Sequence, residues 1–135
     1  MNLIELNDKV DALQEKIQGI KGEKMDKIVL DYIKEPNLFD SVAKKTAESL
    51  EMSPTQMRRF YDYLIDLLVK ADEKDFSEIL PFIKMLNSKV AYAYARKHAT
   101  IKFKNMIETC VAQVDSKEKL MIFKLFFEAV LGFAK

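Results

Sequence analysis

The chain has 135 residues, of which 49% are hydrophobic and 32% are charged, and its formal net charge is +1. This balance is typical of a single globular domain and excludes an intrinsically disordered chain. Only three glycines and three prolines are present, so an all-β fold would lack its turns, whereas the abundant lysine, leucine, glutamate and alanine favour helix.

The first predicted helix has a narrow apolar seam. Apolar residues recur at spacings of three and four, which is the heptad pattern of a helix that packs along one edge. We expect an N-terminal heptad helix within residues 1–22, docked on its own bundle or on another subunit, and a helical bundle domain over residues 23–135. The seam consists of Leu3, Leu6, Val10, Leu13, Ile17 and Ile20.

The helices of the body are predicted from periodicity and capping residues. An amphipathic segment ends at Pro36, whose ring clashes with a continuing helix. Ser53 and Pro54 form a helix start, and Asp75 and Asp115 each precede a glutamate by three residues near a helix N-terminus. The fold class is therefore all-α, a single compact helical bundle of about five core helices with an extra N-terminal helix. The expected helices span residues 3–18, 25–34, 38–50, 54–72, 78–97, 99–114 and 116–133.

The last predicted helix, KLMIFKLFFEAVLGFAK, is apolar almost all round. Such a helix lies either at the centre of its bundle or in a subunit interface. A central position predicts that Phe123, Phe126, Val130 and Leu131 are inaccessible. Phenylalanines that serve as stacking platforms for nucleobases are the alternative.

Nothing in the sequence predicts secretion or membrane insertion. The longest apolar stretch is interrupted by Lys124 and Glu128 and is too short to span a bilayer. The N-terminus holds acidic residues where a secretory signal has a basic start and an apolar run. Cys110 is the single cysteine and forms no internal disulfide, which fits a reducing compartment. We expect a cytoplasmic protein.

The residues of common catalytic and metal sites are missing. His98 is the only histidine, and with Cys110 it supplies two ligands, whereas zinc takes three or four. No glycine-rich loop is present to bind phosphates in the manner of a nucleotide-binding P-loop. We therefore predict no catalytic residue, no metal site and no cofactor.

Charge is distributed unevenly along the chain. Residues 1–78 hold 17 acids and 12 bases, a balance of −5, whereas residues 79–135 hold 4 acids and 10 bases, a balance of +6. No acid lies between Glu78 and Glu108. An acid-free window of this length favours an anionic partner, although lysines that only keep the protein soluble are the alternative. The basic residues of the window are Lys84, Lys89, Arg96, Lys97, Lys102 and Lys104.

All three arginines lie in two short motifs, QMRRFYDYL and KVAYAYARK. The planar guanidinium group suits phosphate better than an ammonium group does. In the first motif Arg58 and Arg59 lie opposite the apolar stripe of the helix. Asp62 and Asp66 follow at helical spacing, so ordinary surface ion pairs are the alternative to phosphate binding.

The second motif places its basic residues on one side of a helix. Lys89, Ala93, Arg96 and Lys97 fall within an arc of about 100°. The small Ala93 leaves room for a bulky anionic partner to approach this stripe. A tightly packed helix with a lysine-covered outer face explains the same pattern.

Three segments in this order resemble one known family, the small subunits of type III-A CRISPR effector (Csm) complexes. They are MRRFYDYL, LPFIKMLNSKVAYAYARK and FKLFFEAVLGFAK, and the resemblance covers residues 38–135. Residues 1–36 have no counterpart in that family.

The resemblance implies a non-catalytic helical bundle that lies in several copies along guide RNA and target RNA as a minor filament. Its partners would be further copies of itself, the backbone subunits and the large signature subunit of the complex. Guide pairing supplies sequence recognition, so the protein would contact RNA backbone and shape. The motif positions imply that Arg58, Arg59, Lys89 and Arg96 face RNA, and the helical arc adds Lys97.

Two other functions fit the same residues. One is a helical protein–protein adaptor or homo-oligomeric scaffold, whose acid-free window binds an acidic protein surface. The other is a basic subunit of an enzyme. Co-purification of RNA and other CRISPR proteins with the chain would distinguish the RNA-binding CRISPR subunit from both of these alternatives.

Overall fold

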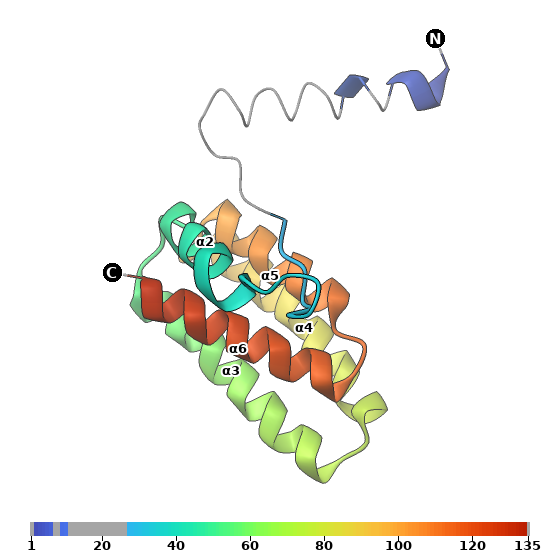
Figure 1. Ribbon diagram of the computed structural model, residues 1–135, viewed down its shortest axis with the longest axis vertical. Helices are drawn as coiled ribbons and strands as arrows, with labels where there is room; N and C mark the ends of the chain where they lie inside the picture. Colours follow the sequence, from blue (N-terminus) through green and yellow to red (C-terminus); the bar gives the residue numbers. More distant parts are fainter. Residues whose placement is uncertain (1, 7–8, 11–26, 135) are drawn as a thin grey trace.

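The computed structural model describes residues 2–6, 9–10 and 27–134. Every regular element within these ranges is helical, which confirms the all-α fold class (Figure 1). The expected helices from residue 38 onwards are present, with both ends within two residues of the expectation. The elements are the π-helix η1 (Leu38–Val42), which continues into α2 (Ala43–Ser49), then α3 (Pro54–Glu73), α4 (Phe76–Ala95), α5 (Ile101–Gln113) and α6 (Lys117–Phe133).

The core of the bundle is aromatic and joins three helices. Phe103 of α5 and Phe123, Phe126 and Phe127 of α6 are fully buried. The Phe103 ring lies 5.2 Å from that of Phe60 on α3 and 5.9 Å from that of Phe127, both edge to face. Such ring pairs contribute about 0.5–1.5 kcal/mol each beyond the area that they bury. Helix α6 packs on α2 and α3, and α4 packs on α3 and α5 (Figure 1).

Hydroxyl side chains cap three of the helices. Ser53 accepts a hydrogen bond from the N–H of Thr55, with Pro54 in the first turn, which confirms the predicted start of α3. The expectation for Asp115 is wrong, because Ser116 is the N-cap of α6 and accepts a hydrogen bond from the N–H of Lys119. Thr100 caps α5 in the same way.

The predicted helix over residues 25–34 is wrong for the residues that are described. From residue 27 to residue 37 the chain forms turns, and its backbone is held by side chains from other elements. Leu30 donates its N–H to Gln113 Oε1 at 2.8 Å, and its carbonyl oxygen accepts a hydrogen bond from Lys119 Nζ at 2.6 Å. These tertiary hydrogen bonds replace the intrahelical ones, so Leu30 is buried although no helix forms.

Helix α6 is buried on one side only. Phe123, Phe126 and Val130 are fully buried, which confirms that these three side chains lie in the core and rules them out as exposed stacking platforms. Leu131 was expected to be inaccessible but is only half-buried, and Phe133 is 38% exposed. The end of α6 therefore extends past the core.

The apolar residues at the start of the chain are exposed. Leu3, Ile4, Leu6 and Val10 all have large accessible areas, so Leu6 and Val10 are not docked on the bundle. The rest of the seam and the predicted boundary at residues 22 and 23 lie outside the described residues. No helix in the described part combines the length and apolar character needed to cross a membrane.

Candidate nucleic-acid interface

A groove runs along the surface between α3 and α4. Cavities of about 210, 280 and 170 Å³ follow one another along it. Gln56 and His98 line both the first and the middle cavity, and Tyr63 and Lys89 line both the middle and the third. Because the cavities share their walls, they form one continuous surface, called here the α3–α4 groove.

The α3 side of the groove is polar and charged. Arg59, Tyr63, Asp66 and Lys70 are spaced by four, three and four residues, and each lines the middle or the third cavity. Arg58 lies about 100° further around the helix and lines none of the three cavities. The structure therefore separates the two adjacent arginines, and only Arg59 belongs to the groove.

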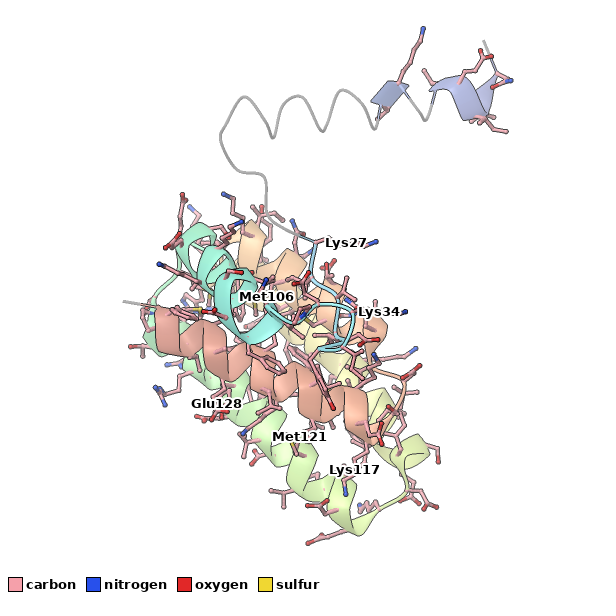
Figure 2. The ribbon with its side chains drawn as sticks, in the orientation of Figure 1. Lys27, Lys34, Met106, Lys117, Met121 and Glu128 are labelled. Atoms are coloured by element: carbon pink, nitrogen blue, oxygen red, sulfur yellow. The ribbon has the colours of Figure 1, made fainter. Side chains whose placement is uncertain are left out.

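The opposite side of α3 is already occupied by α6. The Tyr61 hydroxyl donates a hydrogen bond to Glu128 at 3.2 Å. Glu128 lies on α6 (Figure 2), which packs on α3. Burial raises the pKa of Tyr61, and the Glu128 carboxylate raises it further. Tyr61 is thus committed to packing, unlike Tyr63 two residues later.

The α4 side of the groove combines apolar, aromatic and basic side chains. Phe82, Met85, Lys89 and Tyr92 are spaced by three, four and three residues and line the middle or the third cavity. Ala93 lines the middle cavity, where its small side chain keeps the space between the helices open. Within the repeat of alanine and tyrosine, Tyr92 and Ala93 therefore form part of the cavity wall.

Two of the predicted basic residues lie over aromatic rings. Lys89 Nζ is 4.3 Å from the centroid of the Tyr63 ring, across the groove. Arg96 Cζ is 5.3 Å from the centroid of the Tyr92 ring, one helical turn away. The Phe60 ring, which belongs to the core, contacts that of Tyr63 edge to face at 5.9 Å. These contacts orient the cations without neutralising their charge.

The predicted basic residues have no close acidic partner among the described residues. Arg58, Arg59, Lys89, Arg96 and Lys97 form no ion pair with another described residue. The surface ion pairs considered for Arg58 and Arg59 are therefore absent from this part of the chain. The ion pairs found among the described residues join Lys104 to Glu108, Lys117 to Asp72 and Lys124 to Glu128.

Lys97 reaches the groove by a route that helical periodicity does not describe. Helix α4 ends at Ala95, so the arc that suggested Lys97 does not extend to it. Instead Lys97 adopts a left-handed conformation with φ of 64°, and the N–H of His98 bonds to the Ala93 carbonyl oxygen at 2.8 Å. This is the Schellman pattern that ends many helices. It brings Lys97 to the wall of the first cavity.

The first cavity lies where two turns meet. The Thr100 hydroxyl donates a hydrogen bond to the Leu50 carbonyl oxygen at 2.6 Å and thereby joins the α4–α5 turn to the α2–α3 turn. Glu51, in the second of these turns, has a left-handed conformation with φ of 52°. A non-glycine residue is strained in this region of conformational space, so both turns store a small unfavourable energy beside the groove.

The described part of the chain offers few side chains for metal binding or for nucleophilic catalysis. No group of three or more histidine, cysteine, aspartate or glutamate side chains there is arranged to hold a metal ion. Cys110 is fully buried, and burial raises the pKa of its thiol. His98 is exposed at the groove, so these two residues do not form one site.

Sequence reasoning missed the tyrosines and polar residues of the groove. Tyr63 follows Arg59 by four residues, and Tyr92 precedes Arg96 by four. The same spacing that revealed the basic stripe thus also indicated these rings. Gln56 and His98 had no such pattern, because they reach the groove from the ends of two different helices.

Comparison with known proteins identifies one family. The family model described as Csm2 Type III-A matches residues 33–135, which is more than half of the chain and includes both sides of the groove. No curated protein and no solved structure shows a significant match.

Proposed function

Since this chain belongs to the Csm2 Type III-A family and is a small subunit of a type III-A CRISPR effector complex, we propose that it binds RNA through the α3–α4 groove. Its bound RNA is guide RNA together with target RNA. Several copies stack along these strands as a minor filament, beside the backbone subunits and the large signature subunit. The subunit acts in the cytoplasm by positioning RNA and catalyses no reaction.

The observation that supports this proposal is a row of cations along one groove that form no ion pair with another described residue. Arg59 of α3 and Lys89 of α4 both line the middle cavity, Arg96 lies over Tyr92, which lines it too, and Lys97 lines the first cavity. Guanidinium and ammonium groups along one groove suit binding to the phosphates of one strand. Arg58 lies outside the groove and would contact RNA only from its rim.

Binding of this kind is independent of sequence and sensitive to salt. Each phosphate contact releases counterions, so each contact contributes about 0.7 to 0.9 to the slope of log K against log salt concentration. A few contacts per copy give weak binding. Repetition of the subunit along one RNA converts weak binding into avidity. Base pairing with the guide then supplies the specificity that the subunit lacks.

The proposal is tested by titrating labelled single-stranded RNA with the full chain over a series of salt concentrations. Replacing Arg59, Lys89 and Arg96 by alanine should weaken binding and lower the salt slope by about 2, which is three contacts at about 0.7 each. Replacing Lys9, Lys16 and Lys27 by alanine removes the same charge from the acidic N-terminal half of the chain and should change little. Equal losses of RNA affinity in both triple variants would mean that only net charge matters, and they would refute the groove as the RNA-binding site.

A protein partner gives a different result. If the chain is an adaptor for an acidic protein surface, the wild-type protein should not bind RNA at physiological salt. The triple variant of Arg59, Lys89 and Arg96 should then still fail to co-purify with the acidic protein partner. RNA titration and co-purification together separate these two outcomes.

A further inference from the structure

We propose that the middle cavity of the α3–α4 groove holds one unpaired nucleobase of single-stranded RNA, stacked on Tyr92 and bordered by Tyr63. Arg59 and Lys89 then hold the phosphates on either side of that nucleotide. This inference rests on the proposed function and adds a site for a base to a surface so far assigned to phosphates.

The cavity has room for one planar ring system. Its volume is about 280 Å³, below the range of about 300–1,000 Å³ that drug-sized ligands occupy. Ala93 forms part of its wall, and a larger residue there would fill the space. The residue after Tyr92 is therefore a small alanine, although a larger apolar side chain at this position would bury more surface.

Two tyrosine rings border this cavity and remain accessible. Tyr63 is 40% exposed and Tyr92 is 63% exposed, although aromatic residues are usually more deeply buried. Both line the middle cavity, one from each helix. Exposed aromatic rings in a positively charged groove are the platforms on which single-stranded nucleic acids stack their bases.

The rings are held in place before any ligand arrives. Phe60, which is buried, contacts Tyr63 edge to face, and Lys89 Nζ lies over the same ring. Arg96 covers part of Tyr92 and leaves much of that side chain accessible. Little conformational entropy is lost when a base stacks on rings that are already ordered.

Polar side chains at the cavity can satisfy the edge of any base. The Gln56 amide offers a donor and an acceptor, and His98 offers ring nitrogens that do either. Neither residue imposes one hydrogen-bond pattern, so the site accepts all four bases. It rejects a paired base, because the faces of a base within a duplex are covered by its neighbours.

The test compares two RNAs with the same number of phosphates. A single-stranded oligonucleotide and an abasic oligonucleotide of equal length are each titrated with the full chain over the same series of salt concentrations. Wild type should bind the base-containing strand about 5- to 150-fold more tightly, the range that stacking of one base supplies. Tyr92→Ala should abolish this preference without changing the salt slope, whereas Tyr92→Phe keeps the ring and should retain it.

Tyr94→Ala is the matched control, since Tyr94 is exposed on the same helix but lines none of the three groove cavities. It should leave the preference intact, and circular dichroism checks that each variant is folded. If wild type binds both strands equally with a steep salt slope, the base site is refuted while phosphate binding stands. If it binds neither strand, both proposals fail.

Discussion

Lys89 on α4 places its ammonium nitrogen 4.3 Å from the centroid of the Tyr63 ring on α3. This contact joins the two helices that form the groove, and it fixes a cation where two cavities meet. A ring attracts the cation without cancelling its charge, so Lys89 is both ordered and available to an anion. The RNA-binding proposal depends on this combination more than on the number of basic residues.

Replacing Lys97 by glycine should stabilise the protein and weaken RNA binding. Glycine adopts the left-handed conformation of this position without steric cost, so the free energy of unfolding should rise by about 1 kcal/mol. The lost ammonium group removes one phosphate contact from the first cavity. Urea unfolding and RNA titration measure the two effects on the same sample.

Glu51→Gly is the control for Lys97→Gly, because Glu51 has the same left-handed conformation in the neighbouring turn. It should raise the free energy of unfolding similarly, while RNA affinity does not fall. Unchanged RNA binding in Lys97→Gly would remove Lys97 from the interface.

Asp66→Asn should increase RNA affinity. Asp66 is an acidic residue of the third cavity, where it lies with Lys70 and Lys89 and opposes an anionic ligand. Removing an exposed charge of this kind changes binding by about 0.2–1 kcal/mol, or about 1.4- to 5-fold. Asp62→Asn makes the same change in net charge outside the groove cavities. Equal gains in both variants would mean that the location of the charge is irrelevant.

Phe127→Ala should cost about 3–5 kcal/mol in the free energy of unfolding. The ring is fully buried and contacts those of Tyr61, Phe103 and Phe123. Phe133→Ala, near the exposed end of the same helix, should cost about 1 kcal/mol or less. Circular dichroism during urea unfolding gives both values, and similar costs would contradict the one-sided burial of α6.

Cys110 should make stability fall at high pH. Burial raises its pKa in the folded state, so above the ordinary value of about 8.5 the thiol ionises only in the unfolded chain. The unfolded state then binds fewer protons, and the free energy of unfolding decreases by about 1.4 kcal/mol per pH unit. Cys110→Ala should lack this contribution. The difference between the two pH profiles is the measurement, and parallel profiles would show that the folded thiol ionises normally.

Replacing Leu6 and Val10 by serine should leave the melting temperature of the isolated chain unchanged. Both side chains are exposed, so no buried apolar surface is lost. Incorporation into the effector complex should decrease, because we expect the apolar seam to dock on another subunit. Pull-down with the remaining subunits measures the incorporation of the double variant. Full incorporation would refute a docking role for the seam.

The sequence by itself determined the helices and much of the core. Periodicity located α3 to α6 with ends within two residues, because an amphipathic helix is a local pattern that burial then reinforces. The same argument correctly placed Phe123, Phe126 and Val130 inside. Ser53 was recognisable because a cap acts on residues only two or three positions away.

Only the tertiary structure decided which side chains meet. Leu30 is buried without a helix, because Gln113 and Lys119 bond to its backbone from far along the chain. Arg58 and Arg59 are equivalent in sequence, yet α4 packs beside Arg59 alone. Periodicity gives the angle of a side chain around its own helix but not the neighbour on that side. The groove between Tyr63 and Lys89 therefore became visible only once α3 and α4 were packed together.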